Sequence, residues 1–214
     1  MAVEEPAEKE KSFFTDIQAE DEANLVKRSQ KGDRAAFNEL VRRHQKRIYN
    51  LCYRILGNRE EAEDVAQEVF ITVYKSLKDF RGDSALTTWI HTITTNHCKN
   101  RLKYLKRRRY FQTNSIDDIV ETNEGDMKRE YASDEFYSPE EELEHSEAGI
   151  EIEKAINELE DEYKIVIVLR DVQGLSYQEI ADILDLKEGT VKSRIHRARL
   201  ELQAKLRHLI KAED

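Results

Sequence analysis

Residues 80–109 read FRGDSALTTWIHTITTNHCKNRLKYLKRRR, and the interpretation of the whole chain depends on this stretch. Residues 82–84 predict a turn that offers an N-cap to a helix starting near Ala85. Spacing at about 100° per residue gives this helix an apolar arc and a polar arc. The apolar arc comprises Leu86, Trp89, Ile90, Ile93 and Tyr104, and the polar arc comprises Thr92, Asn96, Lys99 and Lys103. The polar arc favours a surface that contacts bases and then phosphates, although a solvated cationic helix end beside an ordinary tryptophan core gives the same pattern.

The charges of this 214-residue chain are segregated along the sequence. The formal net charge is −9, with eight acids against two bases in residues 1–22 (net −6) and thirteen against two in residues 111–147 (net −11). Basic residues concentrate at 99–109 and 187–207. The acidic total argues against a uniformly basic DNA-binding protein, so the segregation is the informative property.

Several kinds of site are not predicted. Cys52 and Cys98 are far apart and have no second cysteine or histidine at ligand spacing, so we expect two small helix residues in a reducing cytosol. No apolar run has the length of a signal-peptide core or a membrane span, and we therefore expect a cytoplasmic protein without membrane insertion of its own. We predict no metal, no cofactor and no catalytic residue, because neither a nucleophile with a base nor a phosphate-binding glycine loop is present.

Three helices are predicted before residue 80, at about 21–30, 34–56 and 59–80, with Asp33 and Asn58 as N-caps of the second and third. The third has a buried arc and an opposite face of acids, an amide and one isoleucine. That face comprises Glu61, Asp64, Gln67, Glu68, Ile71 and Lys75. It suits docking to a basic partner, although a solvated face has the same composition. Asp64 and Glu68 lack the further ligands that a metal site requires.

A helix-turn-helix is predicted near the end of the chain. After the acidic segment 111–138, Ser138 and Pro139 restart helical structure, and Ser176 with Glu179 forms a capping box. The following helix begins near Gly189 and presents a polar, cationic first half, as a recognition helix does, although antiparallel helical hairpins have similar spacing.

Three motifs together resemble the extracytoplasmic-function group of bacterial sigma factors: DVAQEVF, FRGDSA…TWI…N and LSYQEIA…GTVKSRIHRAR. The resemblance implies an all-α fold with two small helical domains joined by a flexible acidic linker, the second domain being a helix-turn-helix. The expected parts are a disordered acidic extension (1–20), sigma region 2 (21–110), the linker (111–138) and sigma region 4 (139–212). Glu160 replaces the family's usual proline, and the turn at Leu186 and Lys187 lacks a good capping side chain.

The function that the resemblance implies is that of an alternative sigma factor, which directs core RNA polymerase to specific promoters in a stress response under an anti-sigma factor. The residues implied to bind core polymerase are Asp64, Gln67, Glu68 and Ile71. Those implied to read and melt the minus-ten element are Phe80, Arg81, Asp83, Ser84, Trp89, Thr92, Asn96, Lys99 and Lys103, with a base flipped into a pocket at the loop 80–84 near Trp89 and Asn96. Those implied to bind the minus-thirty-five element are Thr190, Lys192, Ser193, Arg194, His196 and Arg197.

Two other classes of protein explain less of the sequence. A two-domain helix-turn-helix regulator that acts without polymerase accounts for residues 176–207 but not for the face around Asp64 and Glu68. A DNA-processing enzyme needs a carboxylate cluster, and the acids of 117–147 have no periodicity that assembles one.

Overall fold

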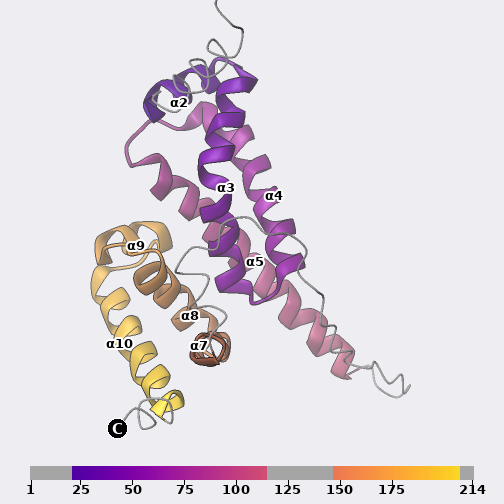
Figure 1. Ribbon diagram of the computed structural model, residues 1–214, viewed down its shortest axis with the longest axis vertical. Helices are drawn as coiled ribbons and strands as arrows, with labels where there is room; N and C mark the ends of the chain where they lie inside the picture. Colours follow the sequence, from indigo (N-terminus) through magenta and orange to yellow (C-terminus); the bar gives the residue numbers. More distant parts are fainter. Residues whose placement is uncertain (1–20, 115–146, 208–214) are drawn as a thin grey trace, which may run out of the picture.

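The computed structural model describes residues 21–114 and 147–207, and every regular element within those ranges is helical (Figure 1). The first range contains α2 (Glu22–Gln30), α3 (Arg34–Leu56), α4 (Arg59–Ser76), the 3₁₀ turn η1 (Leu77–Asp79) and α5 (Leu86–Asn114). The second contains α7 (Glu147–Asn157), α8 (Asp161–Ile167), the π-helical turn η2 (Val168–Val172), α9 (Tyr177–Leu184) and α10 (Glu188–Lys205). The all-α prediction is confirmed. The acidic extension, the cap at Ser138 and residues 115–138 of the expected linker lie outside the described residues. The first four residues of that linker, 111–114, continue α5 instead.

The caps predicted at Asp33, Asn58 and Ser176 are present, whereas the one predicted at residues 82–84 is not formed by a side chain: Ser84 donates to the carbonyl of Ala85. The side chain of Asp33 accepts hydrogen bonds from the backbone N–H groups of Ala35 and Ala36, and that of Asn58 accepts one from Glu61. Ser176 and Glu179 form the complete capping box that begins α9. Local side-chain chemistry therefore determines where these helices begin.

Some boundaries differ from the sequence expectations. The third helix was expected to continue to about Phe80, but α4 ends at Ser76 and its last turn tightens into η1. The break before α8 forms at Glu160 without a proline, because this residue has an extended ψ of 145° and its carbonyl accepts from the N–H groups of Tyr163 and Lys164. A helix can thus restart after Leu159 without the family's usual residue.

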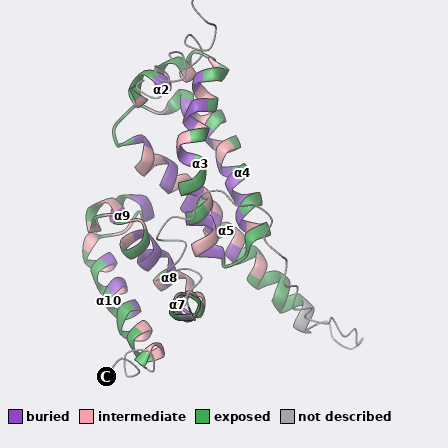
Figure 2. Ribbon diagram, viewed as in Figure 1, coloured by how far each residue is buried: buried purple, intermediate pink, exposed green. Residues whose placement is uncertain are grey.

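The helices α3, α4 and α5 pack side by side, and α2 covers one end of this bundle (Figures 1 and 2). The predicted buried arc of α4 is confirmed, with Val65, Val69 and Val73 at 3% exposure or less. One member of the apolar arc of α5 was misplaced: Tyr104 is 52% exposed. The C-terminal end of α5 extends beyond the ends of α3 and α4 (Figure 1).

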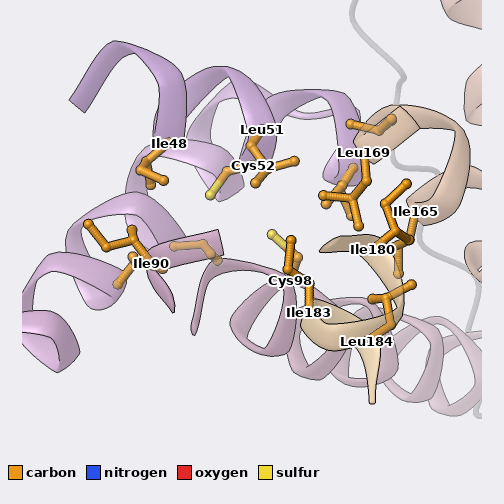
Figure 3. Packing of buried hydrophobic residues seen from close by; sticks show 14 of the residues in the cluster. Ile48, Leu51, Cys52, Ile90, Cys98, Ile165, Leu169, Ile180, Ile183 and Leu184 are labelled. Carbon is orange, nitrogen blue, oxygen red and sulfur yellow. The ribbon is translucent and has the colours of Figure 1, made fainter. Parts of the chain in front are cut away.

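The two halves of the protein share one continuous apolar core, which the two-domain prediction did not include. Figure 3 shows Ile180, Ile183 and Leu184 of α9 beside Cys98 of α5, and Leu169 beside the end of α3. Both cysteines, Cys52 and Cys98, are buried free thiols in this core. The packed arrangement fixes the position of the C-terminal helices against α5.

Polar contacts also cross this boundary. Lys106 of α5 forms an ion pair with Asp161 of α8 at 2.7 Å, and Arg54 of α3 lies 3.9 Å from Glu153 of α7. At Gly57 the backbone has a positive φ of 68°, and a Cβ there would lie 2.7 Å from Oδ1 of Asn157. A side chain on residue 57 would therefore be strained by the backbone conformation and would displace the carboxamide of Asn157.

Candidate protein and nucleic-acid interfaces

The outer face of α4 carries the residues predicted to bind a protein partner. Asp64, Gln67, Glu68 and Ile71 are all exposed, and Ile71 is 54% exposed although it is a large aliphatic side chain. They lie opposite the valines that α4 buries. The face thus combines carboxylates with an uncovered apolar group, a composition that orients and anchors a basic partner. Binding to core polymerase itself stays a prediction.

Two side chains of α5 hold the carboxylates of this face, and the sequence reading did not find them. The guanidinium of Arg101 pairs with Glu61 and donates to Glu68 at 2.8 Å, and it lies 3.9 Å from Asp64. His97 lies 3.4 Å from the same Glu68 carboxylate. Arg101 belongs to the basic run at 99–109, yet its charge is directed to α4. Its spacing of four residues from His97 was the available signal, but only packing shows that α4 is the neighbour.

The loop between η1 and α5 borders a pocket of about 310 Å³. The ring of Phe80 packs on Trp89 with centroids 5.0 Å apart, and Gly82 has a φ of +79°, a conformation that favours glycine. The pocket is lined from the loop side by Phe80, Arg81, Gly82, Ser84 and Leu86, and from α2 by Glu22, Ala23, Val26, Lys27 and Gln30.

The residues that line this pocket are only partly the ones that the sequence interpretation grouped together. The sequence interpretation grouped the loop with Trp89 and Asn96, but neither residue lines the pocket, and α2 supplies its second wall. Asn96 lies ten residues beyond Leu86 on α5, which is about 15 Å along the helix axis. The contribution of α2 could not be read from periodicity, because it depends on how two segments some fifty residues apart pack.

The polar arc of α5 is divided by the tertiary structure. Asn96 and Lys103 are exposed, whereas Thr92 and Lys99 are partly buried. Thr92 donates its hydroxyl to the carbonyl of Thr88 at 3.0 Å. Burial lowers the pKa of Lys99, and the positive charges of Arg194 and Lys103 lower it further. Lys99 therefore faces the C-terminal half in this arrangement, and Lys103 lies more openly toward solvent.

The predicted recognition helix is α10, which follows α9 after a turn at Asp185 with a φ of 53°. Lys192, Ser193, His196 and Arg197 are exposed, and Thr190 and Arg194 are partly exposed. Two of the cations are engaged within the protein, since Arg194 pairs with Glu162 at 2.7 Å and Lys192 with Glu188 at 2.5 Å. Among the described residues His196 and Arg197 have no ion-pair partner, so they are the members of the set best placed to contact DNA.

Features of other functional classes are absent from the described ranges. Within residues 21–114 and 147–207, no group of three or more histidine, cysteine or acidic side chains could hold a metal ion. No helix in the same part of the chain has the length and apolar character needed to cross a membrane.

Comparison with known proteins gives two family matches. The profile of Sigma-70 region 2 matches residues 40–108, and that of Sigma-70, region 4, matches residues 149–202. These two segments correspond to the helices on either side of the acidic segment.

Among similar proteins, the RNA polymerase sigma-H factor of Pseudomonas aeruginosa is 38% identical over 192 residues, which cover 90% of this chain and 97% of that protein. The ECF RNA polymerase sigma-E factor of Escherichia coli (strain K12) is 39% identical over 187 residues, which cover 87% of this chain and 95% of that protein. The sigma factor RpoE from Bartonella quintana, solved in complex with the anti-sigma factor NepR, has a similar fold with a TM-score of 0.58. That match has 24% identity and covers 80% of this chain and 96% of the solved one.

Proposed function

The chain belongs to the extracytoplasmic-function group of RNA polymerase sigma factors, and from this premise we propose which of its surfaces perform each step of promoter recognition. Sigma factors of this kind are transcription initiation factors, so the steps are binding steps. Core polymerase binds α4, the minus-ten element binds the loop 80–84 and the polar arc of α5, and the minus-thirty-five element binds α10. In this proposal, residues 21–110 form sigma region 2, residues 139–212 form sigma region 4, and residues 111–138 are the linker between them.

The single observation that carries the proposal is the outer face of α4. A helix that buries Val65 and Val69 has no structural need to expose Ile71 in the middle of an acidic face. An exposed aliphatic side chain among fixed carboxylates is favoured where a partner desolvates it. A helix-turn-helix regulator that acts alone has no use for this face.

The test is assembly with core polymerase. Asp64→Lys combined with Glu68→Lys reverses two charges of the face and should reduce the affinity for core polymerase by at least tenfold, while circular dichroism shows unchanged helical content. Glu63→Lys is the matched control, because Glu63 is an exposed acid of α4 that lies outside this face. Normal holoenzyme assembly by the double variant would show that α4 does not dock polymerase.

The DNA contacts are assigned by position and charge. An unstacked base of the minus-ten element enters the pocket between the loop and α2, because extracting a base costs a few kcal/mol and requires a shaped pocket with polar groups. Phe80, Arg81, Asp83 and Ser84 form or border the loop wall, and Trp89 supports Phe80 from behind. Lys99 and Lys103 hold phosphates, and Thr92 and Asn96 contact the adjoining nucleotides.

Regulation by an anti-sigma factor in a stress response is the further part of the proposal. A protein of this fold has been solved in complex with an anti-sigma factor, and the family resemblance implies the same kind of partner here. The partner would cover both DNA-binding surfaces in the cytoplasm. Co-purification of the full chain from its native cell, followed by loss of the co-purifying protein on addition of excess core polymerase, would test this.

A further inference from the structure

The last residue of α2 holds the end of the α4–η1 helix in place. The side-chain amide of Gln30 donates two hydrogen bonds from Nε2, at 3.0 Å to the carbonyl of Leu77 and at 2.8 Å to the carbonyl of Phe80. Carbonyls at a helix C-terminus have free acceptor capacity, and Gln30 adds a second donor to the carbonyl of Leu77, which also accepts from the N–H of Phe80 at 3.2 Å. Since both neighbours are acceptors, the NH₂ group of Gln30 must face them, which fixes the orientation of the carboxamide.

Phe80 is thereby anchored on two sides. Gln30 holds its backbone carbonyl, and Trp89 packs on its ring at 5.0 Å. The loop that follows has few further attachments: Arg81 and Asp83 form an ion pair with each other at 3.3 Å, and both side chains are about 80% exposed. Weak, exposed pairs of this kind contribute little to holding a backbone in place. The direction in which the loop leaves Phe80 therefore depends on the Gln30 contact.

Gln30 also lines the pocket that this loop borders. Val26 and Leu86 give the pocket an apolar floor, being 8% and 6% exposed, and the polar groups are at its edge. Lys27 contributes an exposed ammonium group to the α2 wall. An apolar floor with polar groups around it suits a flat heterocycle whose edge carries donors and acceptors.

We propose that Gln30 is a positioning residue for base recognition, which holds the turn 77–80 so that the loop 81–84 forms one wall of a nucleobase pocket while α2 forms the other. The inference rests on the proposed function, since it assumes that this pocket receives an unstacked base. It goes beyond that function because it gives α2 a role in base selectivity. This helix precedes the first family motif in the sequence. Lys27, whose exposed ammonium group lines the α2 wall, is the group of this wall that would meet the phosphate of that nucleotide.

A purely structural role for Gln30 makes a different prediction. A hydrogen-bonding side chain that only stabilises the fold would lower the melting temperature when removed and would weaken binding to every DNA sequence alike. A positioning role changes the preference among bases at one site, because a displaced loop contacts all bases less selectively. The ratio of affinities between bases thus separates the two roles.

The experiment uses holoenzyme assembled from the full chain and core polymerase. Single-stranded oligonucleotides of the minus-ten region, with each of the four bases in turn at each position, are titrated by fluorescence anisotropy. Gln30→Leu removes both donors, Gln30→Glu keeps the shape but places a carboxylate against two carbonyls, and Gln30→Lys restores donors to them. Gln45→Leu is the control, because Gln45 is exposed on α3 and does not line the pocket.

We expect Gln30→Leu and Gln30→Glu to reduce the ratio between the best and worst base at one position by about five- to tenfold. Gln30→Lys should restore most of it, and Gln45→Leu should equal the wild type. Core-polymerase affinity and binding of minus-thirty-five duplex should stay within about twofold for all variants. If Gln30→Leu fails to fold, the comparison of Gln30→Glu with Gln30→Lys provides the same test.

The outcomes distinguish this inference from the proposed function. A wild-type holoenzyme that shows no base preference at any position refutes the base pocket and the role of Gln30 with it. A wild-type preference that survives unchanged in Gln30→Leu and Gln30→Glu refutes the role of Gln30 alone. Equal loss of affinity for all bases in these variants assigns Gln30 a structural role and likewise overturns the inference.

Discussion

Replacing His91 by leucine should remove a large part of the acid sensitivity of this protein. His91 is 1% exposed, and neither ring nitrogen has a hydrogen-bond partner among the described residues. The pKa of this imidazole is lowered to about 4, chiefly by burial and further by its electrostatic interactions with Arg47 and His44 on α3, while Glu179 on α9 opposes them. The ring therefore lies where both α3 and the C-terminal half influence it, and it is neutral in the folded protein.

The sign of the pH dependence follows from proton uptake. In the unfolded chain His91 binds a proton below its ordinary pKa of 6.5, whereas in the folded protein it does so only near pH 4. The free energy of unfolding is thus unaffected above pH 6.5, falls as the pH decreases from about 6.5 to about 4, and then levels off. The difference between these two pKa values corresponds to a total loss of about 3 kcal/mol in the free energy of unfolding. About 2 kcal/mol of this is lost between a pH of about 7.5 and a pH of about 5.

The assay is urea unfolding of the wild type and His91→Leu at these two pH values. Other groups titrate in both proteins, so the quantity of interest is the difference between their losses. We expect the wild type to lose about 2 kcal/mol more than the variant, and His196→Leu, which changes an exposed histidine of α10, to behave like the wild type. At neutral pH the variant should be at least as stable as the wild type, because leucine leaves no buried nitrogen unpaired. Equal losses in wild type and His91→Leu would refute the assignment of His91 as a buried neutral imidazole.

Three other substitutions test separate parts of the structure. Arg197→Ala should weaken binding of the minus-thirty-five element by about 1–3 kcal/mol and relax the preference at one base pair, as selection from a randomised duplex library would show. Lys103→Ala should weaken binding to all sequences alike and reduce the salt dependence by about one ion, and a changed sequence preference would contradict its assignment to phosphate. Gly57→Ala should lower the melting temperature more than Gly32→Ala does. Both residues have a positive φ, but only at Gly57 would the added Cβ meet a neighbour, Asn157 at 2.7 Å. Equal losses in thermal unfolding would mean that the two halves do not pack this closely in solution.

The sequence alone determined the elements and their faces, because the relevant interactions are local. A cap such as Asp33 bonds to residues two and three positions away, and the Ser176–Glu179 box closes within one turn. The buried and exposed sides of α4 follow from a period of 3.6 residues in a helix whose core lies on one side. The family motifs lie on these elements, and for that reason the fold class and the function could be predicted together.

Only the tertiary structure decided which faces meet. The helix α5 is covered by α3, α4 and the C-terminal half, so its apolar residues do not form one stripe, and periodicity misplaced Tyr104. Periodicity also gave no sign that Arg101, within the basic run at 99–109, is directed to the carboxylates of α4. The pocket requires Gln30 and Phe80, fifty residues apart, to lie at hydrogen-bond distance. His91 gives no sign in the sequence of being buried between two halves. Such contacts depend on the free energy of packing whole helices together, which no local pattern of residues encodes.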